Sequence, residues 1–216
     1  MSRLRGLTEF RQAGWTRLPF RFDQQALDTF SKLEPHVGRG RRLTDMIELS
    51  NTLPDGFKKS LAEFGFNASP LRAVGFNKSS DSNWSLPWHQ DRVIAVPHKT
   101  DAPEFKNWSR KSGVWHCEPP AFVLAQIAFA YIVFDDVKDG MGGLELAERS
   151  HRHGIVPEKN IAKFVNLSKI VCPSMVTGDV LLVSAMTLHR SALIKTDMRR
   201  RALRVDFGAT ALNLSK

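Results

Sequence analysis

The sequence predicts a mainly β protein with flanking helices, and three observations support this fold class. The first third of the chain has apolar residues at helical spacing. From residue 71 onward, apolar, β-branched and aromatic runs are bounded by glycine, proline, aspartate and serine. The length of 216 residues allows a sizeable buried core. We therefore expect one domain over 1–216, with a mostly helical annex at 1–70 and a β-rich core at 71–210.

Three helices are expected in the annex. Asp23 has the side chain of a good N-cap for a helix over 24–34. Thr44 is expected to cap a second helix over 45–53 in the same way. Pro54 is expected to open the third helix, since proline suits the start of a helix.

Four strands are expected in the core, from the runs LRAVGFNK (71–78), FVLAQIAFAYIVF (122–134), GDVLLVSA (178–185) and RALRVDFGA (201–209). Between them lie two long segments without a strand pattern, 92–118 and 147–166. Structureless segments of this length often form the walls or lid of an active site. Whether 92–118 closes as a lid is left open by the sequence.

Composition excludes several classes of protein. The chain has 42% hydrophobic and 25% charged residues, which are ordinary values for a globular protein and argue against disorder. No apolar run reaches the roughly 18–20 residues of a membrane span, and the N-terminus lacks the apolar region of a secretory signal. Two cysteines, Cys117 and Cys172, are too few for a disulfide framework and favour a reducing, cytoplasmic location.

The net charge of +9, from 31 Lys+Arg and 22 Asp+Glu, raises the alternative of a nucleic-acid-associated or ribonucleoprotein-associated factor. One basic cluster lies at 39–42 and a second at 199–204. No helix-turn-helix, zinc-finger or RNP-like motif accompanies them, which makes a nucleic-acid partner the weaker hypothesis. The second cluster alternates with apolar residues as a strand does, so some of its arginines are expected to point inward.

The segment Pro87-Trp88-His89-Gln90-Asp91 carries the first chemical signal. In a strand, residues two apart face the same way, so His89 and Asp91 would aim an imidazole and a carboxylate at one point. With one more histidine they would complete the 2-His-1-carboxylate triad that binds Fe(II) on one face. A lone His-x-Asp occurs by chance in many proteins, so the signal needs support from elsewhere in the chain.

That support lies about a hundred residues further on. A buried strand at 178–184 is followed by His189, and a second strand begins near Arg200. A histidine after one strand and an arginine at the start of the next can lie side by side in an antiparallel barrel. The histidine would be the third metal ligand, and the arginine could bind the far carboxylate of a dicarboxylate cosubstrate.

Three stretches of this sequence together resemble the phytanoyl-CoA dioxygenase-like Fe(II)/2-oxoglutarate oxygenases, over roughly 70–208. These stretches are FNKSSDSNWSLPWHQD (76–91), DDVKDGMGGLELAERSHRHG (135–154) and GDVLLVSAMTLHRSALIKTDMRRRALRVDF (178–207). The second departs from the family pattern, because it lacks the usual Pro-Gly before Ser-His. The resemblance implies a double-stranded β-helix, the jelly-roll or cupin-like barrel.

The resemblance also implies roles for individual residues. His89, Asp91 and His189 match the three Fe(II) ligands. Arg200 matches the 2-oxoglutarate arginine and Ser191 the hydroxyl that assists it. Arg199 and Arg201 remain rivals for the arginine role, because a slip of one residue exchanges the faces of a strand. Lys78 and Tyr131 are further candidates for the wall of the cosubstrate pocket.

The implied reaction consumes 2-oxoglutarate and O2, releases succinate and CO2, and hydroxylates a small molecule that the sequence does not identify. The basic excess is compatible with an anionic substrate. Residues near the metal loop are substrate candidates: Trp84, Trp88, Gln90 and Arg92. The remaining alternative is a non-catalytic cupin-like binding protein, which would have little need of both the triad and the arginine.

Overall fold

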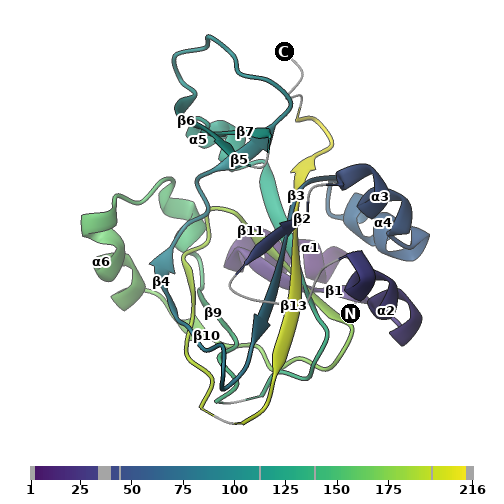
Figure 1. Cartoon of the computed structure of the whole chain (residues 1–216). Coiled ribbons are helices and arrows are strands. Elements are labelled where there is room, and N and C mark those ends of the chain that lie inside the picture. Colours follow the sequence, from purple (N-terminus) through teal and green to yellow (C-terminus); the bar gives the residue numbers. More distant parts are fainter. Residues whose placement is uncertain are drawn as a thin grey trace.

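The structure is a computed structural model, and it describes residues 3–33, 40–43, 45–111, 113–138, 140–195 and 197–212. Two antiparallel sheets face each other and form the body of the molecule (Figure 1). The larger has six strands in the order β1-β11-β8-β13-β3-β2 and the smaller has four in the order β10-β9-β12-β4. This is the mainly β architecture, with flanking helices, that the sequence predicts.

The strands of the six-stranded sheet come from both the N-terminal and the C-terminal parts of the chain. They are β1 (Trp15–Arg21), β2 (Arg41–Leu43), β3 (Phe66–Lys78), β8 (Ile127–Val133), β11 (Asp179–Ser184) and β13 (Arg200–Ala209). The four-stranded sheet comprises β4 (Leu86–His89), β9 (Leu144–Ala147), β10 (Ile170–Val171) and β12 (His189–Ser191). The 1–70 segment thus supplies two strands of the large sheet in addition to helices.

Helices cover the outer face of the six-stranded sheet, and Figure 1 shows them on the side away from β4 and β9. They are α1 (Arg3–Ala13), α2 (Gln24–Leu33), α3 (Met46–Thr52) and α4 (Asp55–Glu63). Asp23 accepts a hydrogen bond from the Ala26 amide (2.8 Å), as expected of a cap. Asp45 caps α3 by accepting from the Glu48 amide, whereas Thr44 lies outside the described residues.

Two cores result from this layering. Phenylalanine rings dominate the core between the helices and the large sheet, and Phe22, Phe30 and Phe57 pack there with ring centroids about 5 Å apart. The core between the two sheets contains Phe129, Tyr131 and Leu146. Alternate residues of β8 therefore belong to alternate cores, as the pleat of a strand requires.

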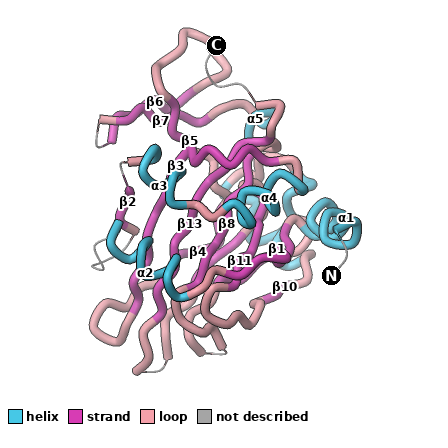
Figure 2. Tube along the Cα trace, turned by 90° about the vertical axis from the view of Figure 1, so that its right-hand side faces the viewer, coloured by secondary structure: helices cyan, strands magenta, loops and turns pink. Residues whose placement is uncertain are grey.

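The prediction for 92–118 as a structureless segment is wrong. It forms a three-stranded sheet of β5 (Ile94–Val96), β6 (Lys106–Lys111) and β7 (Val114–Glu118), at the top of Figure 1. Likewise 147–166 contains short helices: η1 (Ser150–His153), η2 (Glu158–Asn160) and α6 (Ile161–Asn166). Figure 2 shows the strands of the main body running together below the small sheet.

The run 122–134 was expected to be one strand but divides into α5 (Ala121–Leu124) and β8. Pro120 precedes α5 and its carbonyl accepts from the Val123 and Leu124 amides, which begins a helical turn. None of the helices in the described ranges is long and apolar enough to span a membrane.

Candidate functional site

Strand pairing brings the three predicted metal ligands together. His89 is the last residue of β4 and His189 the first of β12, and the two are directly paired across the antiparallel ladder. Their ring centroids lie 4.3 Å apart. Asp91 follows β4, where its amide donates to the Ala185 carbonyl (3.1 Å) and so holds the backbone in place. One ligand atom from each residue lies within 4.8 Å of the others.

The donor atoms of this triad fit a divalent metal ion. The Nδ1 atom of His89 lies 2.8 Å from the Pro87 carbonyl, and that of His189 lies 2.9 Å from the Thr187 carbonyl. Since a carbonyl only accepts, each Nδ1 carries the proton and each Nε2 is left with a lone pair for a metal. Asp91 Oδ2 lies 3.2 Å from His189 Nε2 and forms an ion pair with Arg204 Nη1 at 2.6 Å.

The charges around the triad also suit a metal. Burial acts to raise the pKa of Asp91, but the Arg204 guanidinium, His189 and Arg72 together hold it well below its usual range. Burial and the neighbouring His189 lower the pKa of His89. At neutral pH the carboxylate is therefore ionised and the His89 imidazole neutral, which are the forms that bind a metal ion.

A second cluster contains the four residues expected at the cosubstrate. Arg200 begins β13 and pairs directly with Lys78 at the end of β3. Lys78 Nζ donates to Ser191 Oγ (2.8 Å) and to the Ala192 carbonyl (2.6 Å). The Arg200 guanidinium donates to the Tyr131 hydroxyl and, at 3.4 Å, to Ser191 Oγ. All four side chains thus meet at one end of the sandwich.

This cluster has an excess of buried positive charge. Lys78 is 0% exposed and Arg200 2% exposed, and no carboxylate of the described residues forms an ion pair with either. Burial, and then the charge of Arg200, lowers the pKa of Lys78 to about 7. Burial raises the pKa of Tyr131, which keeps its hydroxyl protonated. A buried guanidinium and a buried amine that takes up a proton near pH 7, both surrounded by neutral oxygens, form a site that fits a carboxylate.

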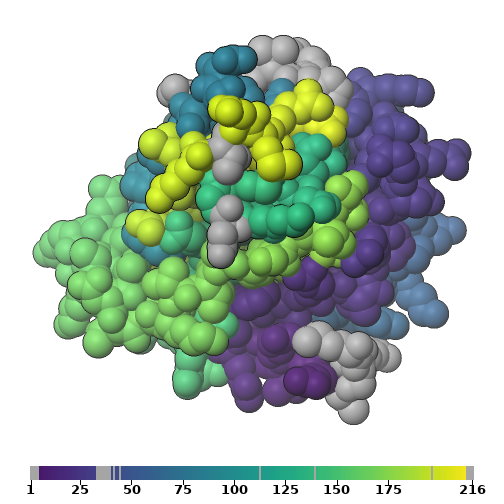
Figure 3. Space-filling model, turned by 90° about the horizontal axis from the view of Figure 1, so that it is seen from below, coloured from purple at the N-terminus to yellow at the C-terminus, as the bar shows by residue number. Residues whose placement is uncertain are grey.

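Loops close this end of the molecule. Figure 3 views it from below, where the segment near residue 195 (yellow) lies against the teal segment near residue 140. The Lys195 amide donates to the Gly140 carbonyl at 2.7 Å, and Met141 forms a β-bridge with Ile194. Gly142 has a positive φ of 60°, and a Cβ there would lie 2.5 Å from the Ala192 carbonyl oxygen. The segment at Gly142 therefore packs closely against the Ala192 carbonyl, which also accepts the hydrogen bond from Lys78.

The structure distinguishes Arg200 from its two rivals by position. Arg199 is exposed. Arg201 points away from the site and binds Asp135 through Nε and Nη2 (3.0 and 2.6 Å). Arg200 alone of the three is buried beside Ser191.

The four substrate candidates lie in different places. Trp84 lines the same small cavity as His189 and Arg200, with its ring 5.1 Å from Lys78 Nζ. Trp88 faces the other way, packing under α6 with Arg190 over its ring. Gln90 is buried and its amide binds three backbone groups, those of Gly154, Met186 and Val156. The Gln90 side chain therefore acts as a brace between loops.

Arg92 also makes structural contacts, donating to the Val156 carbonyl (2.9 Å) and lying 3.8 Å from Glu118. The structure thus brings only Trp84 of these four to the cavity. Its remaining wall is largely apolar and comes from both sheets: Phe76, Leu86, Phe129 and Leu144.

Three charged residues at the site were missed by sequence reasoning. Arg204 lies 2.6 Å from Asp91 and 2.7 Å from Asp206, and Arg72 lies 2.7 Å from Asp206. The signal was the alternation of β13, which puts Arg200, Arg204 and Asp206 on one face. The sequence indicates that some arginines of 199–204 point inward, but it does not identify their ion-pair partners, because Asp91 and Arg72 come from other segments.

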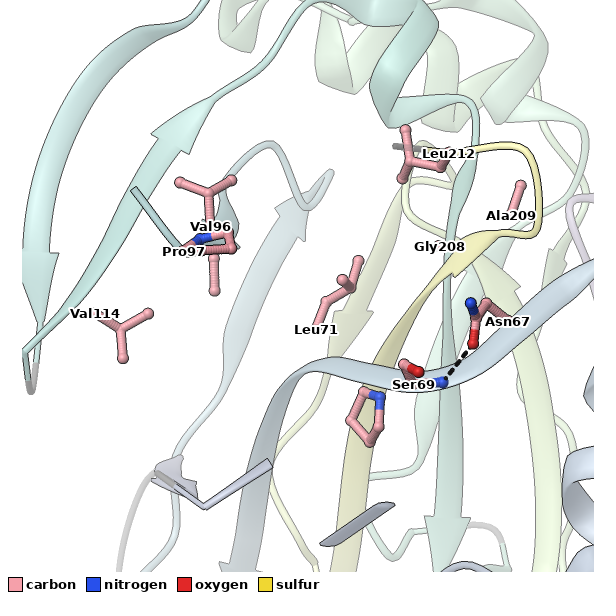
Figure 4. A pocket seen from close by; sticks show the side chains of 11 residues that line it. Asn67, Ser69, Leu71, Val96, Pro97, Val114, Gly208, Ala209 and Leu212 are labelled. Carbon is pink, nitrogen blue, oxygen red and sulfur yellow. Dashed lines mark hydrogen bonds between the residues drawn. The ribbon is translucent and has the colours of Figure 1, made fainter. Parts of the chain in front are cut away.

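A separate hollow lies at the far end of β3 and β13, and Figure 4 shows Leu71, Val96, Val114 and Leu212 around it. Its lining contains no acidic, basic or thiol side chain. This hollow therefore offers no ionisable side chain for acid–base chemistry or metal binding.

The antiparallel double sheet, the His-Asp-His triad and the buried arginine together define a non-haem iron, 2-oxoglutarate-dependent oxygenase. The family model for phytanoyl-CoA dioxygenase (PhyH) matches residues 8–202. The chain therefore belongs to the phytanoyl-CoA dioxygenase family, which uses Fe(II), 2-oxoglutarate and O2. No curated protein matches the chain in sequence.

Solved structures of similar fold include three that share only 15–17% identity with the chain. EctD from S. alaskensis, solved with 2-oxoglutarate and 5-hydroxyectoine, has a TM-score of 0.72 at 15% identity and covers 100% of this chain and 79% of its own. AviO1 from Streptomyces viridochromogenes Tue57 has a TM-score of 0.64 at 17% identity, covering 98% and 97%. The epimerase SnoN, solved with Fe3+, alpha ketoglutarate and nogalamycin RO, has a TM-score of 0.63 at 15%, covering 96% and 83%.

Proposed function

We propose that this chain oxidises a small molecule at a C–H bond, with His89, Asp91 and His189 holding Fe(II). The observation that carries the proposal is the convergence of two imidazoles, each fixed through Nδ1 by a backbone carbonyl, on the half-buried Asp91 carboxylate. A bound iron ion with 2-oxoglutarate supplies the oxidising power, consuming O2 and releasing succinate and CO2. The protein would hold the iron ion, 2-oxoglutarate and the substrate in a fixed arrangement.

The proposed cosubstrate contacts follow from the cationic cluster. Arg200 binds the far carboxylate of 2-oxoglutarate, with the Tyr131 and Ser191 hydroxyls holding its guanidinium in place. Lys78 adds a second positive charge to the same carboxylate. These contacts would satisfy buried groups that otherwise have only neutral partners, and a charge-assisted hydrogen bond contributes about 1.5–3 kcal/mol.

The substrate would meet the apolar side of the cavity, where Trp84 and Phe129 lie. A wall of this kind suits a small molecule with an apolar portion. We propose hydroxylation as the outcome, because Asp91 occupies the place that related halogenases leave open for halide. The similar structures include a protein solved with a hydroxylated compound and another described as an epimerase, so a substrate assay must decide this outcome.

Anaerobic titration with Fe(II) and 2-oxoglutarate tests the proposal. We expect the weak visible absorption band that 2-oxoglutarate gives when it chelates Fe(II), and we expect Asp91→Ala to lose both the band and substrate-dependent succinate release. Asp135→Ala is the matched control, because Asp135 binds Arg201 away from the site. Absence of the band in folded wild-type protein, or wild-type turnover by Asp91→Ala, would contradict the assignment.

A further inference from the structure

Asp91 belongs to a ring of four charged side chains, of which Arg204 and Asp206 are buried and Arg72 and Asp91 are half-buried. Arg204 Nη1 lies 2.6 Å from Asp91 Oδ2, and Arg204 Nε lies 2.7 Å from Asp206 Oδ1. Arg72 Nη2 lies 2.7 Å from Asp206 Oδ2 and 3.9 Å from Asp91 Oδ1. Two carboxylates and two guanidinium groups therefore alternate, and their formal charges cancel.

Strand geometry builds this ring. Arg204 and Asp206 are two apart on β13, so both face inward, and Asp206 is paired across the ladder with Arg72 on β3. Only Asp91 comes from the loop after β4. The ring thus ties the metal loop to the two longest strands of the sheet.

Arg204 is the most constrained member of the ring. Its guanidinium is held by Asp206 on one side and Asp91 on another, and its Cζ atom lies over the Phe129 ring, 4.3 Å from the ring centre. The residue is 8% exposed and lines the cavity beside His189. Because these three contacts fix the guanidinium, its Nη1 atom has one position beside Asp91.

We infer that Arg204 is a positioning residue that fixes the orientation of the Asp91 carboxylate for metal binding. This inference rests on the proposed function, since it requires Asp91 to be a metal ligand. Free Asp91 could turn toward Arg72, which already lies 3.9 Å from its other oxygen. Arg204 prevents this rotation. The Asp91 carboxylate is therefore already oriented before the metal ion binds, and the loop after β4 does not have to become ordered on binding.

The role requires the forked shape of arginine in addition to its charge. Nε and Nη1 reach two different carboxylates at the same time, whereas the single ammonium group of lysine cannot bridge them in this fixed geometry. A positioning role for Arg204 and a role as a nearby positive charge therefore predict opposite effects of its removal on metal binding. If Arg204 were only a nearby positive charge, removing it would strengthen the binding of a cation.

Co2+ binding, measured by anaerobic calorimetry and by the visible spectrum of the bound ion, tests the inference without turnover. We expect Arg204→Met and Arg204→Lys each to weaken Co2+ binding at least 10-fold, within the 10–100-fold range seen when partners of metal ligands are removed. The Co2+ spectrum should also change, because the carboxylate would coordinate differently. Arg201→Met is the matched control, since Arg201 lies on the same strand but binds Asp135.

The outcomes separate the two ideas. Wild-type protein that fails to bind Co2+ would overturn the proposed function. Wild-type binding together with unchanged or tighter binding by both Arg204 variants would overturn only the positioning role. Far-ultraviolet circular dichroism checks the fold of each variant, and the lysine variant keeps the test decisive if the methionine variant does not fold.

Discussion

At the residue scale, Lys78 is the group whose chemistry depends most on its surroundings. It is paired with Arg200 across the β3–β13 ladder and has no exposed surface. Burial and the Arg200 charge lower its pKa from 10.5 to about 7. Near neutral pH, the protein without cosubstrate therefore holds this lysine close to half protonated.

This lowered pKa predicts a pH dependence of stability. Between pH 7 and 10.5 the unfolded chain binds a proton that folded Lys78 does not, so the free energy of unfolding should rise with pH in this window. The slope for one proton is at most about 1.4 kcal/mol per pH unit, and below pH 7 the contribution is flat because both states are protonated. Urea unfolding of the metal-free protein measures it.

Lys78→Met should remove this part of the slope, while Lys106→Met, at an exposed position of β6, should leave it unchanged. Equal slopes for the wild type and Lys78→Met would show that Lys78 keeps an ordinary pKa.

Sequence motifs indicate functional residues best when these residues lie close together in the chain at a fixed spacing. His89 and Asp91 are two apart, so their spacing predicts that they share one face, and the family resemblance added His189 and, two residues after it, Ser191. Arg204 and Asp206 could not be assigned in this way, because their role depends on Asp91 and Arg72 from other segments. Gln90 was expected at the substrate, yet its neighbours in space are backbone groups of remote loops.

At the element scale, β13 separates two functions between its two faces. Arg200, Arg204 and Asp206 face the site, whereas Val205 and Phe207 face the helices. Phe207 is fully buried, and its ring centre lies 5.9 Å from that of Phe57 in α4. Stability and chemistry can therefore be changed separately on one strand.

Phe207→Ala should lower the free energy of unfolding by about 3–5 kcal/mol, because it leaves a cavity in a closed aromatic core. Co2+ affinity of the folded fraction should stay near the wild-type value. Phe122→Ala is the control, since Phe122 is 65% exposed and its loss should change stability by about 0.5 kcal/mol or less. Urea unfolding compares the two, and similar losses would contradict the packing argument.

The elements that sequence analysis missed have weak local signals. β6 has the sequence KNWSRK, with Trp108 as its only apolar side chain, so its strand character depends on pairing with β7. α5 is apolar throughout, and only the preceding prolines show that a helical turn comes before β8. Strands such as β8 and β11 were predicted because each is a run of consecutive, mostly apolar residues, and this pattern is visible in the sequence without knowledge of their partners.

At the scale of the whole molecule, the proposed ligands join distant parts of the chain. His89 and Asp91 lie about a hundred residues before His189, and Lys78 lies on a different sheet from Ser191. A metal ion and 2-oxoglutarate bound here would connect the two sheets. A ligand that binds only the folded state stabilises it in proportion to the logarithm of its concentration.

Mn2+ and 2-oxoglutarate, each at about 100 times its Kd, should together raise Tm by roughly 11–22 °C, since about 2.7 kcal/mol is gained for each ligand at that concentration and 1 kcal/mol corresponds to about 2–4 °C at this size. Differential scanning fluorimetry measures the shift, and EDTA should reverse it. Asp91→Ala should show no shift with Mn2+. A shift of equal size in that variant would place the metal elsewhere.

The position of β13 in the large sheet has a consequence for synthesis of the chain. Among the strands of the large sheet β13 is synthesised last, yet it lies between β8 and β3 and forms the longest ladders of the sheet with them. Until it is inserted, β8 and β3 each keep an unpaired edge that other chains can join. The large sheet therefore stays open to misassembly until β13 arrives, and the same insertion delivers Arg200 and Arg204 to the site.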